Sequence, residues 1–213
     1  GTGYQPSSAR QTEIDTIRQQ RSVSDLRTEQ QSFANKNIFA TGAAETSYDP
    51  RDVVIGVSPA TGKDIWVTLS GLSLADAISE VLAGLEEEGC TGRIVRINDT
   101  LDLGMIGLTA ARLSGSGVSV GLQAKGTALI HRRDLAPLAN LELYSVAPTI
   151  TRELYRMMGI NAGRHAKGAT PEPVRNPYSD EAIEARYHTK VVSLVAIERN
   201  CVTKDGPEVL ELR

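Results

Sequence analysis

The chain contains 213 residues, 40% of them hydrophobic, with a formal net charge of −3 and a pI near 5.7. This length allows one sizeable hydrophobic core, and the acidic balance argues against a nucleic-acid-binding protein, which usually presents a basic face. No apolar run approaches the roughly 20 residues that span a membrane and no secretory signal is visible, so we expect neither a membrane nor a nucleic acid as partner.

The first 50 residues are rich in Gln, Ser, Thr, Arg and Glu and contain few apolar residues. Such a segment buries too little apolar surface to order itself. We therefore expect residues 1–50 to form an extended N-terminal arm and residues 51–213 to form the domain. Two interpretations of the arm stay open: a solvated, partly disordered segment, or a segment that becomes ordered on a partner through Phe33, Ile38 and Phe39.

From Val53 onward, short apolar runs alternate with amphipathic stretches. The run DVVIGVSPA predicts a buried strand that stops at Ser58, and WVTLSGL predicts a second short strand or a connection. The stretch SLADAISEVLAGLEEEG has helical spacing, with Ser73 as the N-cap and Gly89 at its end. RIVRI follows as the next strand. A strand, a helix and a strand in this order indicate a parallel crossover unit.

The second half of the chain continues the alternation. Residues 102–113 predict a short helix, GVSVGL and TALIH predict two strands, and residues 149–167 predict a longer helix. KVVSLVAIE, residues 190–198, is expected to close the domain as a strand. The chain therefore reads as one α/β domain without an internal repeat.

The glycine-rich stretch RLSGSGVSVGLQAKGTALIH, residues 112–131, matches no phosphate-binding fingerprint. A dinucleotide GxGxxG needs a strand before it and a helix after it, which is the reverse of the order here, and no GxxxxGK string occurs. A structural interpretation is that Gly115 and Gly117 allow a tight turn, while Gly121 and Gly126 allow a backbone or ligand to approach closely. It does not explain why polar side chains gather around these glycines, namely Ser114, Ser116, Gln123 and Lys125.

This stretch, followed by LAPLANLELYSVAPTITRELYRMMGINAGRHAK, strongly resembles the medium (β) subunit of adenosylcobalamin-dependent diol and glycerol dehydratases. DVVIGVSPA, AGLEEEG and RIVRI continue the resemblance upstream, so that it covers roughly residues 52–204. The motifs are long and stand in the right order, whereas residues 1–50 match poorly.

The resemblance implies a Rossmann-like three-layer domain with a mostly parallel sheet. It also implies that adenosylcobalamin, with its own base still on cobalt, lies between this chain and a large barrel subunit that performs the radical chemistry. A small subunit would complete a heterotrimer that pairs into a dimer of heterotrimers, and a reactivating factor is a further partner. The reaction would convert 1,2-propanediol or glycerol to an aldehyde and water in the cytoplasm. Substrate preference and residence in a bacterial microcompartment stay open.

Three residues match cofactor-contacting positions of the family. Asp102 and Lys125 match residues that hydrogen-bond the peripheral amides of the corrin ring, and Asn140 matches a residue near the nucleotide loop of the cofactor. A carboxylate accepts from an amide N–H and an ammonium donates to an amide C=O, so the chemistry suits these positions. The alternatives are a helix N-cap for Asp102, a solvated lysine for Lys125 and a turn cap for Asn140.

Further cofactor contacts are inferred from position alone. Ser114 and Ser116 lie on the glycine turn and could donate to the nucleotide phosphate or to the corrin side chains. Pro148 and Leu138 could form an apolar wall for the benzimidazole base, although Leu138 reads equally well as a core residue.

No metal ligand and no catalytic residue is expected in this chain. The string GRHAKG places Gly163 where a base-displaced cobalamin protein has an aspartate two residues before the cobalt-binding histidine, so we do not expect His165 to bind cobalt. The remaining histidines and cysteines fit no metal spacing and are expected to be structural, the cysteines as reduced thiols: His131, His188, Cys90 and Cys201.

Three functions are therefore weighed. The first is the dehydratase medium subunit, favoured by the LSGSG, QAKGT and NLEL motifs. The second is the small subunit of the reactivating factor for these enzymes, a shorter non-enzymatic protein with the same fold. The third is an independent α/β protein that binds an unrelated nucleotide.

Overall fold

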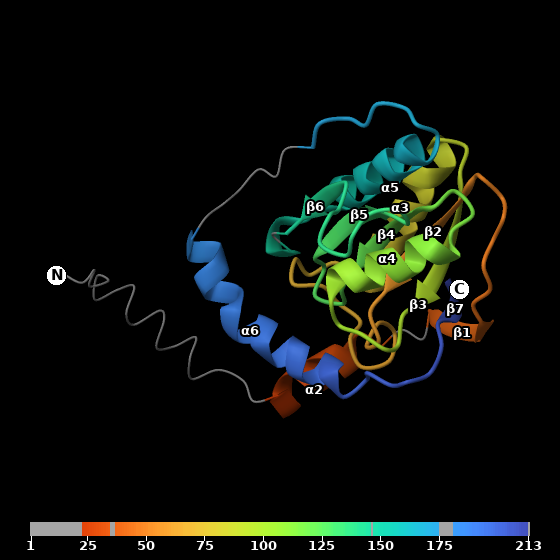
Figure 1. Ribbon diagram of the computed structural model, residues 1–213. Helices are drawn as coiled ribbons and strands as arrows, with labels where there is room; N and C mark the ends of the chain where they lie inside the picture. Colours follow the sequence, from red (N-terminus) through yellow and green to blue (C-terminus); the bar gives the residue numbers. More distant parts are fainter. Residues whose placement is uncertain (1–22, 35–36, 146, 175–180, 213) are drawn as a thin grey trace.

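The computed structural model describes residues 23–34, 37–145, 147–174 and 181–212. These residues form one seven-stranded sheet in the order β1-β7-β3-β2-β4-β5-β6, with helices on both faces (Figure 1). The strands are β1 (Ile38–Ala43), β2 (Asp52–Val57), β3 (Thr91–Arg96), β4 (Val118–Leu122), β5 (Ala128–Arg132), β6 (Glu142–Tyr144) and β7 (Glu208–Leu212). The helices are α2 (Val23–Ser32), α3 (Leu74–Glu87), α4 (Leu103–Leu113), the short 3-10 helix η1 (Ala147–Thr149), α5 (Arg152–Ala166) and α6 (Glu181–Arg199).

The sheet is mixed, so the expected α/β class is confirmed but the expectation of a mostly parallel sheet is wrong. Only β2 runs parallel to its two neighbours, β3 and β4, whereas the other four pairings are antiparallel. The reason is local: residues 123–127 connect β4 to β5, and a connection this short returns the chain antiparallel because a parallel crossover needs a dozen residues or more.

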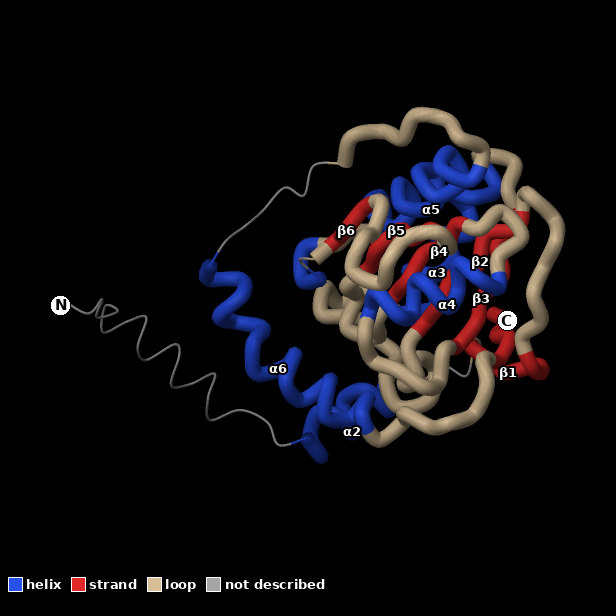
Figure 2. The backbone as a smooth tube through the Cα atoms, viewed as in Figure 1, coloured by secondary structure: helices blue, strands red, loops and turns tan. Residues whose placement is uncertain are grey.

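Alternate residues of the central strand β2 face different helices. Val53 and Ile55 belong to the large core cluster with α3 and α5, whereas Val54 packs with Ile106 of α4 on the opposite face. This period of two is the side-chain alternation of a strand that is covered on both sides. The tube view shows α3 and α5 on one side of the sheet and α4 on the other (Figure 2).

Helices α3 and α5 pack with their backbones in close approach. A Cβ added at Gly84 of α3 would lie 2.1 Å from the carbonyl oxygen of Arg156, and one added at Gly159 of α5 would lie 2.1 Å from that of Val81. The predicted N-cap is confirmed, since Ser73 accepts a hydrogen bond from the backbone N–H of Asp76. The glycine pair therefore sets how closely this layer packs.

Part of the expected N-terminal arm packs on the domain. Strand β1 pairs with β7 at one edge of the sheet, and Leu26 of α2 and Ile38 of β1 are buried, while Phe33 is 51% exposed. Gln30 of α2 accepts from the backbone N–H groups of Trp66 and Val67. Residues 1–22 lie outside the described residues, and the domain boundary at residue 50 stays a prediction.

The strand expected at residues 190–198 is wrong, because this segment belongs to helix α6. Its apolar side chains Leu194 and Ile197 are three residues apart and both are buried, which is helical spacing. The helix packs beside α2 (Figure 1). The last strand is β7 instead. Among the described helices, none is long and apolar enough to cross a membrane.

Candidate functional site

The centre of the sheet has the topology of a doubly wound fold. The chain leaves β2 through α3 to reach β3 on one side, and it leaves β3 through α4, on the other face, to reach β4 on the far side of β2. In such sheets the ligand crevice lies at the carboxyl ends of the strands, where the winding direction reverses. Here that place lies between Ser58, which follows β2, and the turn of residues 123–126, which follows β4.

Asp102 and Lys125 both lie at this edge of the sheet. Asp102 is exposed and is the N-cap of α4, as expected, because its Oδ1 accepts from the Met105 N–H at 2.8 Å. Lys125 is partly buried in the turn after β4. Gln123 connects the two segments, since its Nε2 donates to the Leu101 carbonyl at 2.7 Å. The structure thus brings these two predicted residues to neighbouring segments.

Pro148 belongs to the same edge. Strand β6 ends at Tyr144, which pairs with Ala128, and Ala128 pairs with Leu122 at the end of β4. Helix η1, with Pro148 at its centre and partly buried, follows β6 directly.

Asn140 lies on the connection between β5 and β6, which crosses over the start of α4. A Cβ added at Gly104 would lie 2.2 Å from the Pro137 carbonyl oxygen, so the connection touches the first turn of this helix. Leu138 is 87% exposed, so its interpretation as a core residue is wrong. Asn140 itself is partly buried, and its contact with a cofactor stays a prediction.

Ser114 and Ser116 are not brought together with Lys125. They precede β4, so the length of that strand, about 17 Å for five residues, separates them from the residues that follow it. The Ser114 hydroxyl is buried and donates to the Asp52 carbonyl at 2.6 Å, and it lies 3.0 Å from the Ser116 hydroxyl. These bonds give the serines a role within the fold.

The glycines act as the structural interpretation expects. Gly117 and Gly126 have φ values of 79° and 108°, a region that favours glycine. A Cβ added at Gly121 would lie 3.1 Å from the Gly107 backbone of α4, so this glycine admits a close approach of helix to strand. The glycine-rich stretch therefore forms one turn before and one turn after the buried strand β4.

Glu198 is a residue of this edge that sequence reasoning missed. It lies near the end of α6, is 3% exposed, and its carboxyl accepts a hydrogen bond from the Ser58 hydroxyl. Burial raises the pKa of Glu198, while hydrogen bonds from Ser58 and the Ala124 N–H and the charge of Lys125 act in the opposite direction. The sequence predicts a strand at residues 190–198 with Glu198 as a charged residue at its end, so it does not indicate that this side chain is buried beside Ser58.

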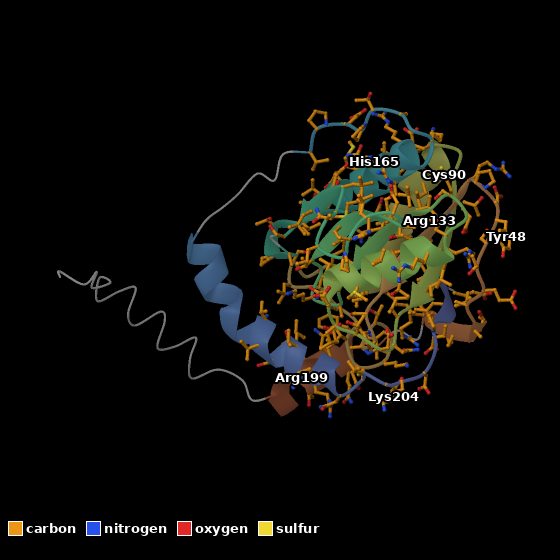
Figure 3. The ribbon with its side chains drawn as sticks, viewed as in Figure 1. Tyr48, Cys90, Arg133, His165, Arg199 and Lys204 are labelled. Atoms are coloured by element: carbon orange, nitrogen blue, oxygen red, sulfur yellow. The ribbon has the colours of Figure 1, made fainter. Side chains whose placement is uncertain are left out.

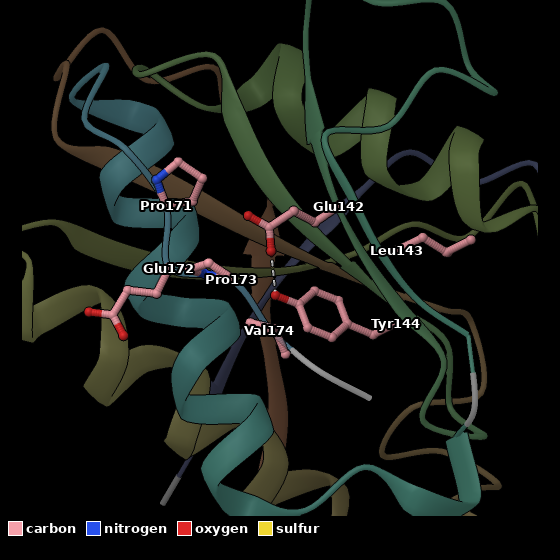
Figure 4. A pocket seen from close by; sticks show the side chains of 7 residues that line it. All are labelled: Glu142, Leu143, Tyr144, Pro171, Glu172, Pro173 and Val174. Atoms are coloured by element: carbon pink, nitrogen blue, oxygen red, sulfur yellow. Dashed lines mark hydrogen bonds between the residues drawn. The ribbon is translucent and has the colours of Figure 1, made fainter. Parts of the chain in front are cut away.

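A pocket of about 400 Å³ opens between β6 and the segment after α5 (Figure 4). Glu142 at its base accepts from Tyr144 Oη at 2.6 Å and from Asn161 Nδ2 at 3.1 Å, and its other oxygen lies 2.8 Å from His165 Nε2. The pocket is lined by Glu142, Leu143, Tyr144, Pro171, Glu172, Pro173 and Val174. The Glu142 carboxylate therefore already has hydrogen-bond partners within the chain.

His165 and the two cysteines have partners or surroundings within the fold. His165 is held by Glu142 and lies on the same side of the molecule as Cys90 (Figure 3). Burial raises the pKa of Cys90, and burial with the neighbouring Asp64 raises the pKa of Cys201 to about 12, so both thiols stay protonated. Within the described part of the chain, no group of three His, Cys, Asp or Glu side chains could hold a metal ion. The His188 side chain lies outside the described ones.

These features define an α/β domain whose sheet is doubly wound at its centre, with a polar edge at the carboxyl ends of its parallel strands. The sequence profile of the dehydratase medium subunit family matches residues 58–172, more than half of the chain, and the chain belongs to that family. The family is part of the B12-dependent diol and glycerol dehydratase systems.

Two solved structures are similar to this chain. A glycerol dehydratase reactivase is 25% identical with a TM-score of 0.46, and the match covers 57% of this chain and 95% of that chain. A diol dehydratase-reactivating factor, solved with ADP and Mg²⁺, is 23% identical with a TM-score of 0.44, over 57% of this chain and 97% of that chain.

Proposed function

We propose that this chain is the medium subunit of a cytoplasmic, coenzyme B12-dependent diol or glycerol dehydratase and holds adenosylcobalamin against a large catalytic subunit. One observation carries the proposal: Asp102 and Lys125, which match corrin-contacting positions of the family, lie on neighbouring segments joined by the Gln123–Leu101 hydrogen bond. The matched residues are more than 20 positions apart in the sequence, and the fold gives them a common edge.

The residues at this edge fit the cofactor that the family implies. Peripheral corrin amides offer both N–H donors and C=O acceptors, which suit a carboxylate and an ammonium respectively. The helix cap uses Oδ1 of Asp102, so Oδ2 can accept from an amide. The exposed Leu138 near the start of α4 adds apolar surface beside these polar groups.

In this role the chain binds and orients and performs no bond-breaking step. Adenosylcobalamin, when bound with its own base on cobalt, supplies the radical chemistry, and the large subunit supplies the substrate pocket. Asp102 and Lys125 would hold the corrin ring through its peripheral amides, Asn140 would lie near the nucleotide loop, and Pro148 would contact the benzimidazole base. The proposed assembly is a dimer of heterotrimers with a large and a small subunit.

The small subunit of a reactivating factor is the second candidate. The solved structures reported above are described as a glycerol dehydratase reactivase and a diol dehydratase-reactivating factor. The polar edge suits this role too, because a carboxylate and an ammonium that bind corrin amides can also bind the backbone amides of a partner protein. Family membership fits both roles, so an experiment has to separate them.

The decisive variant is Lys125→Ala in the complex reconstituted with the large and small dehydratase subunits. Losing one charge-assisted hydrogen bond, typically about 1.5–3 kcal/mol, lowers cobalamin affinity roughly ten- to hundredfold. Turnover at saturating cofactor falls much less, because the contact lies at the ring edge. Lys125→Arg rescues only partly, since the wider guanidinium needs room beside Gly126. Cofactor titration measures these effects.

Lys204→Ala is the matched control, because Lys204 is an exposed lysine on the loop after α6 (Figure 3). It should leave the affinity unchanged. Unchanged cobalamin affinity for Lys125→Ala, with an unaltered melting temperature, contradicts the proposed contact. Failure of the wild-type chain to take up cobalamin with the large dehydratase subunit, together with binding to the large reactivase subunit, supports the second candidate.

A further inference from the structure

Glu198 of α6 occupies the crevice position of a doubly wound sheet, at the carboxyl ends of β2 and β4. The Glu198 carboxyl reaches it from 140 residues further along the chain and accepts from the Ser58 hydroxyl. Ser58 is fully buried and Glu198 is 3% exposed, so the contact is shielded from water. Leu194 and Ile197, buried on the same helix, hold α6 against the core.

Hydrogen bonds from neighbouring segments hold Ser58 in place beside this carboxyl. The Ala124 N–H donates to Ser58 Oγ at 2.9 Å, and the Ser58 N–H donates to the Leu122 carbonyl at 3.1 Å, which fixes Ser58 between both strands. Thr61 ends the same turn, and its carbonyl accepts two bonds from Arg96 at 2.8 and 3.2 Å. None of these hydrogen bonds involves a residue of α6.

Doubly wound sheets bind their ligands at this place in the fold. Here the place is formed, its donors are oriented, and an acid of the chain itself occupies it. We infer that the crevice is a binding site for a small carboxylic acid, that Glu198 fills it as an internal ligand, and that an external carboxyl group binds there when that side chain is removed. This position lies at the same edge of the sheet as Asp102 and Lys125, but it is formed by Ser58 and Glu198, which have no part in the proposed cofactor contacts.

The charge around the crevice favours a carboxyl group over a phosphate dianion. Of the charged groups that face Glu198, Lys125 attracts an anion, while Cys201 beyond α6 stays a neutral thiol. Burial nevertheless raises the pKa of Glu198, so one positive charge does not compensate the desolvation of even a single negative charge. A doubly charged phosphate is penalised more strongly than a carboxyl group that can share a proton.

The test uses the full chain, without cobalamin, and acetate as the probe. Glu198→Ala opens a carboxyl-sized space beside Ser58. Acetate at tenfold above its dissociation constant should raise the melting temperature of this variant by about 3–5 °C at mildly acidic pH. Wild-type protein and Glu198→Gln should show no such rise, because a carboxyl or amide group already fills the space. Sodium chloride at equal ionic strength controls for salt.

Two further arms sharpen the result. Adding Ser58→Ala to Glu198→Ala should abolish the acetate effect, and inorganic phosphate should stabilise Glu198→Ala less than acetate does. An equal effect of acetate on Glu198→Ala and Glu198→Gln overturns the inference, as does a Glu198→Ala chain that stays unfolded throughout the acetate series. Because no arm uses cobalamin, these outcomes are independent of the proposed dehydratase role.

Discussion

Asp52 explains at the residue scale why serines gather around the glycine turn. Its carboxylate is almost fully buried and accepts from Arg93 Nε at 2.7 Å, from Arg93 Nη2 at 2.9 Å and from the Gly115 N–H at 3.1 Å. Its carbonyl accepts from the Ser114 hydroxyl. The glycines and serines are adjacent in the sequence, but Asp52, to which they donate, is more than 60 residues away. The local sequence pattern therefore suggests a ligand as the partner of the serine hydroxyls.

The raised pKa of Glu198 leads to a prediction about how the stability of the protein depends on pH. The folded pKa of Glu198 is raised, so its stabilising contribution is complete below the unfolded value, about 4.3, and is lost as the pH rises through the folded value. Glu198→Gln has no proton to lose. The variant should therefore gain stability relative to the wild type as the pH rises from about 4 to about 8.

Urea unfolding of both proteins across this pH range measures the difference. All other titrating groups are shared by the two proteins, so their contributions cancel in the comparison. A difference in the free energy of unfolding that stays constant with pH would show that Glu198 does not titrate across this range.

At the element scale, strong periodicity predicted most of the structure. The helices at residues 74–87, 103–113 and 152–166 and the strands β2 to β5 fall where the apolar patterns and caps place them. The failures lie where tertiary contacts decide. In residues 190–198, four β-branched residues favour a strand, but burial against the core at Leu194 and Ile197 selects a helix.

The close packing of α3 against α5 leads to a prediction about stability. Gly84→Ala should destabilise the protein by about 1–3 kcal/mol, because the added methyl group would lie 2.1 Å from the Arg156 carbonyl oxygen. The gain in helix propensity, about 1 kcal/mol, is the smaller effect. Urea unfolding measures the change.

Gly206→Ala is the control for this variant, since nothing lies within 4 Å of a Cβ added there. Its stability should stay within about 0.5 kcal/mol of the wild type. A stabilised Gly84→Ala protein would mean that the two helices separate at little cost and that the close approach is not required.

At the scale of the whole molecule, helix α2 of the N-terminal segment is attached through the hydrogen bonds of Gln30 in addition to the buried Leu26. The Gln30 side chain accepts from the Trp66 and Val67 N–H groups at 2.8 and 3.0 Å and donates to the Val67 carbonyl at 3.2 Å. Gln30→Ala leaves these backbone groups without their partner and should cost about 2–3 kcal/mol. Gln31→Ala, its exposed neighbour, should be neutral in the same urea titration.

The comparison of these glutamines tests how the segment is held. Equal stability of the two variants would mean that the Gln30 hydrogen bonds contribute nothing to the stability of the protein. Composition could not predict this attachment, because it does not show that Gln30 is buried.

The pairing of β1 with β7 also has a consequence for how the protein is made. Ala43 and Glu208 are partners in the sheet but lie 165 residues apart. A ribosome that adds about 5–20 residues per second needs roughly 8–33 s to cover that distance. Throughout this interval β1 has no strand to join and the outer edge of β3 is open, so the nascent chain presents two unpaired edges to its surroundings. A chaperone would therefore help this protein mainly by preventing misassembly during translation, and less by stabilising the finished sheet.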